Sequence, residues 1–271
     1  MQVIKTVFFL FAISTSFFIA RGWYLQHKIS VKTAHQQKKL VPHNKKDITF
    51  LWDLHDVVFE HTMKDRLSII WQYDRLGAAF KNLDYNTLSV IGRYFLKILY
   101  LIRAEVTSAE LLYYAQKANN TAFVDLVLRI AQAEKPIAGT VSIIEQLTKD
   151  GYAQDVGSNI GNLACDALAE KFPDIFAHFK NRHVIAMEND KLVSRKPAPS
   201  YFTRYMERYN KKASHIIFID DKKENIAAAQ SLGIIGLLFT SPEQLQADLE
   251  TLGIFEHEKQ AETQKGALAA T

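Results

Sequence analysis

Short apolar runs that end next to polar residues recur along the chain from Asp47 onward. The first run is Asp47–Trp52, which is followed by Asp53, and similar runs lie at 183–187, 215–219 and 234–239. Segments with helical periodicity separate these runs, at 139–149, 162–170, 199–209 and 223–232. Short apolar strands that alternate with helices are typical of parallel βαβ units, whose sheet is covered on both faces. The pattern therefore predicts an α/β fold with a parallel sheet between two layers of helices.

Residues 61–133 follow a different pattern, with helical periodicity and almost no strand signal. Apolar residues recur three or four positions apart, as in Ile69, Ile70, Tyr73, Leu76 and Phe80. An all-helical block directly after the first strand predicts a separate cap domain, which divides the core into residues 47–60 and 134–254. Residues 255–271 are polar and rich in alanine, and we expect a flexible tail.

The first 25 residues contain a hydrophobic segment, because Thr6–Ala20 carries no charge and is flanked by Lys5 and Arg21. It is short for a bilayer span of about 20 residues, although the aromatic residues that follow could extend it. Basic residues downstream resist translocation, so we favour an uncleaved membrane anchor with the domain on the cytoplasmic side. A cleaved signal peptide, which would make the protein secreted or periplasmic, and a buried helix are the alternatives. Residues 26–46 are polar and rich in lysine, which predicts a basic linker.

Charge and cysteine content exclude several classes of protein. The net charge is +4, but residues 1–46 hold eight Lys and Arg and no Asp or Glu, which leaves 25 basic and 29 acidic residues in the remainder. The globular part is therefore mildly acidic, and we expect no nucleic-acid partner. Cys165 is the single cysteine, which excludes an internal disulfide framework and a multi-cysteine metal site.

Polar residues at the ends of the predicted strands form the candidate site. Ligands of parallel α/β sheets bind at the carboxyl ends of the strands, where Asp53, Asp220 and Asp221 are placed. A carboxylate such as Asp53 can attack phosphorus or carbon and form a covalent intermediate that water then hydrolyses. The hydroxyl of Ser158 and the ammonium of Lys196 can hold phosphate oxygens, and the aspartates offer the hard oxygen ligands that Mg²⁺ prefers.

Four separated segments together resemble one family. In chain order they are Asp53-Leu54-His55-Asp56-Val57-Val58-Phe59, then Gly151 with Ser158-Asn159, then Lys196-Pro197-Ala198-Pro199, and finally Phe218-Ile219-Asp220-Asp221-Lys222-Lys223-Glu224-Asn225. Their order, spacing and placement at strand ends resemble the haloacid dehalogenase-like (HAD) hydrolase superfamily, with a helical cap inserted after the first motif. The resemblance implies a Rossmannoid three-layer α/β/α core and a hydrolase, most simply a Mg²⁺-dependent phosphatase of a small phosphorylated metabolite.

The resemblance also implies roles for individual residues. Asp53 would be the nucleophile, Lys196 would hold the phosphate and offset the carboxylates, and Ser158 and Asn159 would bind substrate. The implied metal ligands are Asp53, the backbone carbonyl of His55, and the pair Asp220 and Asp221. Of that pair, family position favours Asp221 as the ligand, while the other residue would cap the next helix. Capping of the helix after Gly161 is an alternative role for Ser158 and Asn159.

The chain departs from the family pattern at three places. Family phosphatases carry a second Asp where this chain has His55, which could shuttle protons near neutral pH or could be an inert filler. Asp56 stands where the family usually has glycine, and its carboxylate would repel a phosphate unless it points away or is paired. The segment 153–157 is unusually polar for a strand, which predicts an edge-like or distorted strand before Ser158.

These departures leave two other functions open. Family branches that act on carbon–halogen or carbon–phosphorus bonds also lack the second Asp, so metal-independent, dehalogenase-like hydrolysis at carbon is one alternative. It would need a cation from the cap, for which Arg66, Arg75, Arg93 and Arg103 are candidates. The other alternative is a catalytically impaired, membrane-tethered binding protein that has lost its proton donor.

Overall fold

The fold is that of a computed structural model. The structure describes residues 29–42, 44–60, 65, 68–69, 121–185, 187–188 and 192–256. The predicted hydrophobic segment 1–25, most of the predicted cap 61–133 and nearly all of the predicted tail lie outside these residues. Within the described part of the chain, no helix combines the length and the apolar character needed to cross a bilayer.

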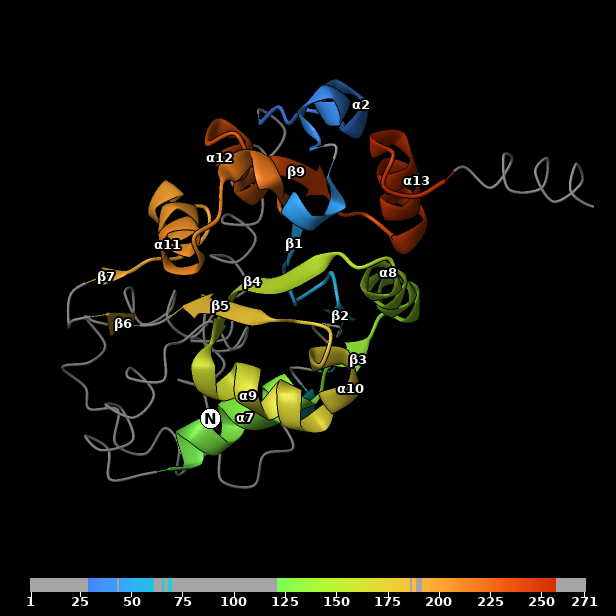
Figure 1. The fold of residues 1–271 in the computed structure, drawn as a ribbon. Coiled ribbons are helices and arrows are strands. Elements are labelled where there is room, and N and C mark those ends of the chain that lie inside the picture. Colours follow the sequence, from blue (N-terminus) through green and yellow to red (C-terminus); the bar gives the residue numbers. More distant parts are fainter. Residues whose placement is uncertain are drawn as a thin grey trace, which may run out of the picture.

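A five-stranded parallel sheet forms the centre of the molecule (Figure 1). Its order is β5-β4-β1-β8-β9, and every neighbouring pair is parallel. The strands are β1 (Thr49–Trp52), β4 (Ala153–Gly161), β5 (Asn181–Ile185), β8 (Ile216–Asp220) and β9 (Ile235–Leu238). The predicted α/β class is therefore confirmed. The first strand, β1, lies in the middle of the sheet. The residue that follows it, Asp53, therefore lies at the centre of the row formed by the carboxyl ends of the strands.

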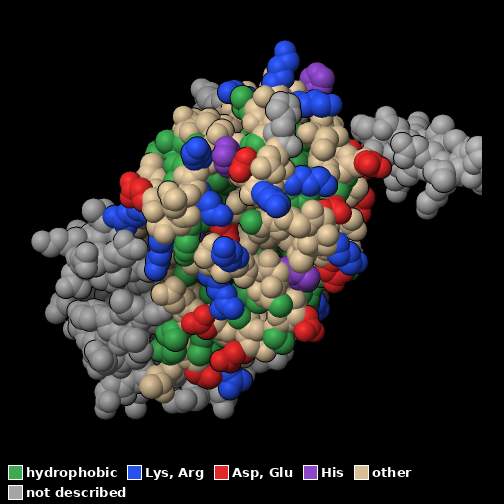
Figure 2. Space-filling model, in the orientation of Figure 1, with side chains coloured by type: hydrophobic (Ala, Val, Ile, Leu, Met, Phe, Trp, Pro, Cys, Tyr) green, Lys and Arg blue, Asp and Glu red, His purple; other side chains and the backbone are tan. Residues whose placement is uncertain are grey.

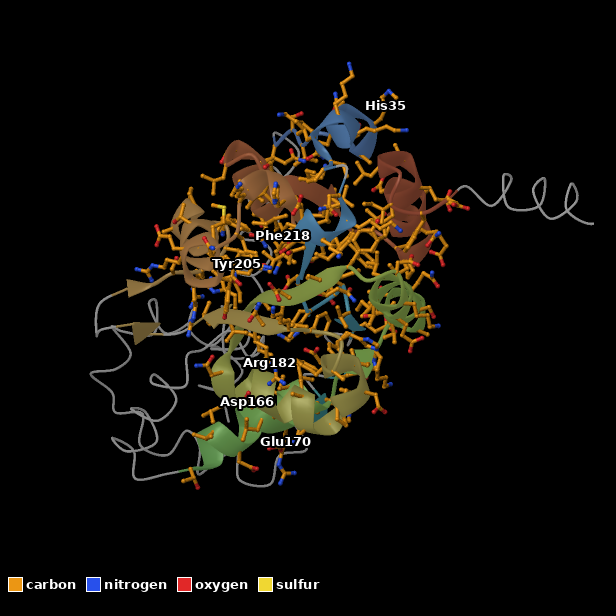
Figure 3. The ribbon with its side chains drawn as sticks, in the orientation of Figure 1. His35, Asp166, Glu170, Arg182, Tyr205 and Phe218 are labelled. Carbon is orange, nitrogen blue, oxygen red and sulfur yellow. The ribbon has the colours of Figure 1, made fainter. Side chains whose placement is uncertain are left out.

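Alternate side chains of the strands face two separate layers of helices. Phe50 and Trp52 of β1 pack with one cluster, while Leu51 packs with the other. The first layer contains α8 (Ala138–Lys149), α9 (Asn162–Lys171) and α13 (Pro242–Leu252), and the second contains α11 (Pro199–Tyr209) and α12 (Lys223–Ser231). Tyr205 of α11 and Phe218 of β8, labelled in Figure 3, belong to the apolar cluster between the sheet and the second layer. This arrangement is the predicted three-layer core.

Local signals explain where several of these helices begin and end. Proline occupies the first turn of α11 and of α13, where its missing N–H costs no helical hydrogen bond. Ser241 caps α13 by accepting a hydrogen bond from the backbone N–H of Gln244 at 3.2 Å. Asn210 and Gly253 end α11 and α13 in the left-handed conformation. A short helix, α10 (Pro173–Phe176), joins α9 to β5.

The polar strand β4 differs from the expectation, because it lies between β5 and β1 and is not an edge strand. The side chains of Gln154 and Asp155 are buried and have specific partners. Gln154 accepts a hydrogen bond from Trp52 Nε1 at 3.0 Å, and Asp155 accepts one from the Tyr205 hydroxyl at 2.7 Å and another from the Asn181 backbone N–H at 3.0 Å. Internal partners thus allow an interior strand to be polar. The expected distortion is present as a shift of the β4–β5 register between Ser158 and Gly161.

Part of the expected linker 26–46 is folded against the core. It contains α2 (Ala34–Gln37) and two 3₁₀ helices, Lys38–Leu40 and Lys45–Asp47. The buried amide of Gln37 exchanges two hydrogen bonds with Gly236 of the edge strand β9, accepting from its N–H and donating to its carbonyl, both at 3.0 Å. A side-chain amide therefore pairs with the backbone of an edge strand, as a neighbouring strand would. The polar, lysine-rich composition of residues 26–46 gives no sign that part of this segment packs against the core.

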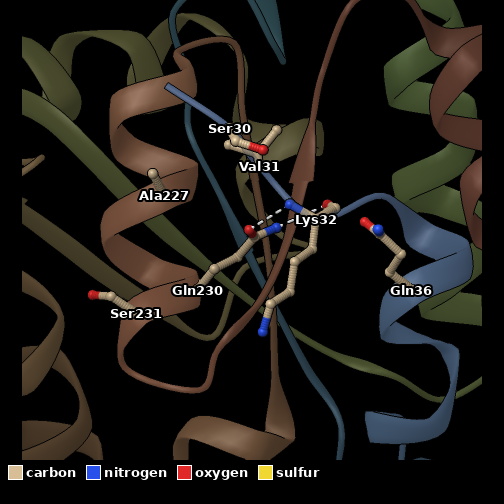
Figure 4. A pocket seen from close by; sticks show the side chains of 7 residues that line it. All are labelled: Ser30, Val31, Lys32, Gln36, Ala227, Gln230 and Ser231. Atoms are coloured by element: carbon tan, nitrogen blue, oxygen red, sulfur yellow. Dashed lines mark hydrogen bonds between the residues drawn. The ribbon is translucent and has the colours of Figure 1, made fainter. Parts of the chain in front are cut away.

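A surface hollow of about 390 Å³ lies between this docked segment and α12 (Figure 4). Lys32 N–H donates to Gln230 Oε1 at 2.8 Å, and Gln230 Nε2 donates to Lys32 O at 3.0 Å across it. None of the predicted site residues lines it. On the face drawn in Figure 2, basic and acidic side chains are intermixed, in keeping with the near balance of charge after residue 46.

Two short ladders complete the described structure. β2 (Phe59–Glu60) pairs antiparallel with β3 (Lys135–Pro136), and β6 (Met187–Glu188) pairs with β7 (Leu192–Val193). The first ladder joins the two chain segments that flank the predicted cap. The last helix of that predicted cap, α7 (Ala122–Gln132), packs against α9 of the core through Val127 and Ala131. The domain division itself stays a prediction.

Candidate active site

The carboxylate of Asp53 is held at the carboxyl end of the central strand β1. Its backbone N–H donates to the carbonyl of Ile219 on β8 at 3.0 Å, which extends the β1–β8 ladder by one residue. Its Oδ1 accepts a hydrogen bond from the N–H of Leu54 at 2.8 Å. The residue is 3% exposed. Asp53 is therefore fixed in both backbone and side chain, with Oδ2 directed to a neighbouring cation.

That cation is the ammonium of Lys196, which joins three segments of chain. Its Nζ lies 3.0 Å from Asp53 Oδ2, 2.6 Å from Asp220 Oδ2 and 2.8 Å from the carbonyl of Gly157. The side chain is fully buried. A buried ammonium is stable only when it is paired and hydrogen-bonded, and here the partners come from the residue after β1, from the middle of β4 and from the end of β8. The structure thus brings Asp53, Lys196 and Asp220 together, as the sequence predicted.

Asn159 holds the backbone of the Lys196 loop. Its Nδ2 donates to the carbonyl of Lys196 at 3.0 Å, and its Oδ1 accepts from the N–H of Lys196 at 2.8 Å. The side chain was expected to bind substrate, but both ends of its amide are bonded to the peptide of Lys196. The geometry therefore favours positioning of the lysine over contact with substrate.

Ser158 lies beside Asp53 with its hydroxyl buried. Oγ has no partner with hydrogen-bond geometry among the described residues, although it is close enough to Asp53 to help lower the pKa of that carboxyl. The alternative role, capping of α9, is not seen, because the N-cap residue is Gly161 and no side chain bonds there. A buried hydroxyl next to the candidate nucleophile is compatible with the predicted role of Ser158 in binding substrate.

Asp220 and Asp221 have different surroundings. Asp220 accepts from the N–H of Lys222 at 2.8 Å and from Asn225 Nδ2 at 2.9 Å on each oxygen, in addition to Lys196. It therefore holds the turn that leads into α12. Asp221 Oδ1, in contrast, is buried and lacks a hydrogen-bond partner among the described residues. Asn225 and Lys222 lie in the fourth sequence motif, but nothing in the residue pattern assigned them these contacts.

The charges of this cluster shift the pKa values of its carboxyls in opposite directions. Burial alone would raise the pKa of Asp53, but the ammonium of Lys196, helped by Lys222, outweighs it and lowers the pKa to about 2. Burial raises the pKa of Asp220 to about 7, with the charges of Asp53 and Asp221 adding to the rise and Lys196 opposing it. Burial, with Asp53 and Asp56 nearby, raises that of Asp221 to about 6. Burial opposes the charge on Lys196, yet the two carboxylates raise its pKa.

These three carboxylates fit a divalent metal ion. One ligand oxygen from each of Asp53, Asp220 and Asp221 can be chosen so that all three lie within 4.8 Å of one another. The orphaned Oδ1 of Asp221 and the raised pKa of that group both indicate an oxygen that lacks compensating charge. Oxygen-only donors at this spacing suit Mg²⁺ better than softer metals. Within the Asp220–Asp221 pair, the arrangement favours Asp221 as the ligand, since both oxygens of Asp220 already accept hydrogen bonds.

His55 contacts a residue that the sequence analysis missed. Its Nδ1 lies against Oε1 of Glu134, which is completely buried. His55 itself is 7% exposed and is near enough to Asp53 to help lower its pKa. Glu134 stands between α7 and β3 with no motif around it, so no sequence signal could have placed it here. The histidine is therefore part of a buried acid–imidazole pair.

Asp56 adopts the conformation that a glycine would favour. Its φ is +60°, in the left-handed region that Asp tolerates better than most residues, and its N–H donates to the carbonyl of Phe59 at 2.7 Å. The side chain is exposed. This explains how Asp replaces the usual glycine, and its carboxylate adds to the negative charge near Asp221.

In the metal-free protein, the free energy of unfolding is expected to fall as pH rises from about 4 to about 7. The pKa of Asp221 is about 6 in the folded chain against an ordinary 3.8, so the folded state holds a proton that the unfolded state releases in this range. About 2 pKa units correspond to about 3 kcal/mol. Asp220, whose pKa burial raises to about 7, contributes to the same slope. Thermal unfolding in EDTA across this range measures the slope, and Asp221→Asn should reduce it to the part that Asp220 contributes.

The lowered pKa of Asp53 acts in a separate range. Its contribution to stability is present above its ordinary pKa of 3.8 and is lost as pH falls through about 2.

Addition of Mg²⁺ should raise the unfolding temperature more at about pH 7 than at about pH 5, because protonated Asp221 is a poor ligand. Stability that rises from about pH 4 to 7 in both proteins, or a Mg²⁺ effect that is larger at acidic pH, would contradict this assignment.

Comparisons with known proteins agree with this geometry. The haloacid dehalogenase-like hydrolase family matches residues 48–233, which is more than half of the chain. A sesquiterpene phosphatase, astK, of Aspergillus oryzae is 30% identical over 112 residues, which cover 39% of this chain and 52% of that protein. The chain thus matches about half the length of this curated relative.

The comparison with solved structures found enzymes of the same family. A HAD family enzyme of Bacteroides thetaiotaomicron, in its magnesium complex, gives a TM-score of 0.50 with 16% identity, over 72% of this chain and 93% of that one. L-2-haloacid dehalogenase of Xanthobacter autotrophicus gives 0.44 with 15% identity, over 74% and 81%. The family match covers all four predicted motifs and the strands that carry them. The chain belongs to the haloacid dehalogenase-like hydrolase family.

Proposed function

We propose that this hydrolase is a Mg²⁺-dependent phosphatase of a small phosphorylated substrate, with Asp53 as its nucleophile. The observation that carries the proposal is the buried ammonium of Lys196 between Asp53 and Asp220, with Asp221 beside them. Phosphoryl transfer mainly requires positioned charge around the phosphoryl oxygens, and this cluster supplies a cation, a carboxylate and a metal-binding set of oxygens. When bound, Mg²⁺ would neutralise negative charge on the phosphate and on the carboxylates.

Asp53 would act in two steps. A carboxylate oxygen attacks phosphorus, the bond from phosphorus to the leaving oxygen breaks, and an acyl phosphate forms on Asp53. Water then attacks the phosphorus of this acyl phosphate, the bond to Asp53 breaks, and inorganic phosphate is released. The low pKa of Asp53 keeps the carboxylate ionised at neutral pH, which the first step needs. The hydroxyl of Ser158 and the ammonium of Lys196 would hold phosphate oxygens in both steps, a role that the buried hydroxyl and the position of the ammonium beside Asp53 support.

His55 would move the protons of both steps. An alcohol leaves as an alkoxide only at high cost, so a proton delivered by the imidazole accelerates the first step. The same ring, now neutral, can take a proton from the water that attacks in the second step. The position of His55 close to Asp53, on the turn that follows the nucleophile, supports this role. A histidine would thus replace the second aspartate of other family phosphatases.

The relative from Aspergillus oryzae suggests which substrates to test first. That protein is named a sesquiterpene phosphatase, and the part it shares with this chain is 30% identical. We therefore include phosphates of terpene alcohols with sugar phosphates and aryl phosphates in a panel of small esters.

Phosphate release by the purified full chain tests the proposal. Release is expected with Mg²⁺, to be lost in EDTA, and to return when Mg²⁺ is added again in excess. Halide release from a 2-haloacid that persists in EDTA, without phosphate release, would favour hydrolysis at carbon. No turnover of any ester, with Mg²⁺ still bound, would favour the impaired binding protein. The candidate cap arginines of the carbon hydrolase lie outside the described residues.

Membrane tethering remains a separate proposal that rests on sequence alone. The uncharged segment Thr6–Ala20 and the basic residues after it support an anchor with the domain on the cytoplasmic side. The alternative is export through a cleaved signal peptide.

A further inference from the structure

The buried contact between His55 and Glu134 has no counterpart in the motifs that define the family resemblance. Glu134 lies just before β3, where the chain returns from the predicted cap, and His55 lies just before β2. The antiparallel pairing of Phe59 with Pro136 and the hydrogen bond from Ile137 N–H to the carbonyl of Val58, at 2.9 Å, join these two segments. The ladder therefore holds the two backbone segments that carry His55 and Glu134 next to each other.

A carboxylate at this depth is stable only with a partner. Glu134 is 0% exposed, and an ionised carboxylate without compensation would cost several kcal/mol in such a place. The Nδ1 of His55 lies against this carboxylate without regular hydrogen-bond geometry, and a protonated ring supplies the opposite charge. One explanation is purely structural, namely that the pair stabilises the joint between the core and the predicted cap. The atom involved indicates more, because contact at Nδ1 also determines which nitrogen of the ring can serve the reaction.

We infer that Glu134 is a positioning residue that keeps a proton on Nδ1 of His55 and directs Nε2 to the reacting groups. While Nδ1–H remains on the carboxylate, the proton that leaves the ring or arrives at it does so at Nε2. Glu134 also limits rotation of the ring, because it binds one nitrogen in a fixed, buried place. This inference rests on the proposed function, since it assigns Glu134 to the proton transfers of that reaction.

The pair also explains why an aspartate would not suit position 55 in this chain. Two carboxylates in contact within a buried site repel each other, and one of them would have to take up a proton. Histidine at 55 and glutamate at 134 therefore act as a matched pair. Replacing either residue alone would leave the other buried without its oppositely charged partner.

The kinetic test compares leaving groups in Glu134→Gln. In the first turnover, alcohol release from alkyl phosphates is expected to fall about 10- to 100-fold, because an alkoxide needs the proton from Nε2. Release from p-nitrophenyl phosphate should fall less than about threefold, since this phenolate leaves without a proton. KM should change little for either class. Glu134→Asp, which keeps the carboxylate, should recover part of the lost rate.

Glu60, which lies on the ladder opposite the residue that follows Glu134, offers a matched control. Glu60 is exposed and pairs with Lys135 across from it, so Glu60→Gln removes an equal charge without touching His55. Its rates should equal those of the wild type for both leaving groups. A structural role for Glu134 predicts instead that alkyl and aryl esters lose rate equally, and that result would overturn the inference.

A spectroscopic measurement decides the inference without any turnover. In full-length protein labelled with ¹⁵N-histidine, long-range ¹H–¹⁵N spectra report which ring nitrogen carries the proton, and His55→Gln assigns the signal. Wild type and Glu134→Asp should show a protonated Nδ1, and Glu134→Gln should show a changed pattern. Identical ring-nitrogen shifts in wild type and Glu134→Gln would contradict the inference. If no ester is hydrolysed, the proposed function fails, while this spectrum still decides the role of Glu134.

Discussion

Replacing Asp53 by Asn is expected to reduce phosphate release by at least about 10⁴-fold while the fold is retained. The amide has nearly the shape of the carboxylate but cannot attack phosphorus. Lys196 keeps Asp220 as a partner at 2.6 Å, so its charge stays compensated in the variant. Steady-state release of inorganic phosphate with Mg²⁺ measures the loss, and thermal unfolding verifies the fold.

The control for this substitution is the same change at a remote carboxylate. Asp166 lies on α9 and pairs with Arg182 at the surface, as labelled in Figure 3. Asp166→Asn should retain the wild-type rate, because neither residue contacts the cluster around Lys196. Retention of more than about a tenth of the wild-type rate in Asp53→Asn would exclude Asp53 as the nucleophile.

Replacing Lys196 by Met is expected to lower the free energy of unfolding by about 3 to 5 kcal/mol at neutral pH. The substitution keeps much of the volume but leaves Asp53 and Asp220 buried without their shared cation. Without it, burial raises the pKa of both carboxyls, so part of the lost stability should return as pH is lowered and they become protonated. Chemical unfolding at neutral and acidic pH measures both effects.

Lys211→Met is the matched control for this second substitution. The Lys211 ammonium lies 3.8 Å from Asp155, another buried carboxylate, but it is partly exposed and Asp155 has other donors. We expect a loss of about 1 kcal/mol or less there. An equal loss in the two variants, or a Lys196→Met deficit that does not depend on pH, would contradict the role given to Lys196.

Much of the fold could be predicted from the sequence because its signals are local. The helix predicted at 199–209 has the bounds of α11, where a proline begins the helix and Asn210 ends it. The strand before Asp53 and the strand before Asp221 were recognisable as apolar runs between polar residues. Since parallel strands end at one edge, their terminal aspartates could be expected to meet, and the structure places them within 4.8 Å.

The remaining features depend on tertiary partners that local patterns do not encode. The polar strand β4 lies inside the sheet because Trp52 and Tyr205, far away in sequence, bond to its side chains. The segment near Gln37 is held on the core by hydrogen bonds to the backbone of Gly236, which is also far away in sequence. Glu134 had no recognisable neighbours, so the partner of His55 could be found only in three dimensions. Asn159 was in a predicted motif, but its bonds to Lys196 could not be read from spacing.

A crystal structure of the full chain with Mg²⁺ and a phosphate mimic would show whether these side chains form one site for the ion and the substrate. We expect the ion on carboxylate oxygens of Asp53 and Asp221 and on the backbone carbonyl of His55, with the mimic beside Asp53 and in contact with Lys196 and Ser158. An ion bound without Asp53 and Asp221, or a mimic held outside this cluster, would contradict it.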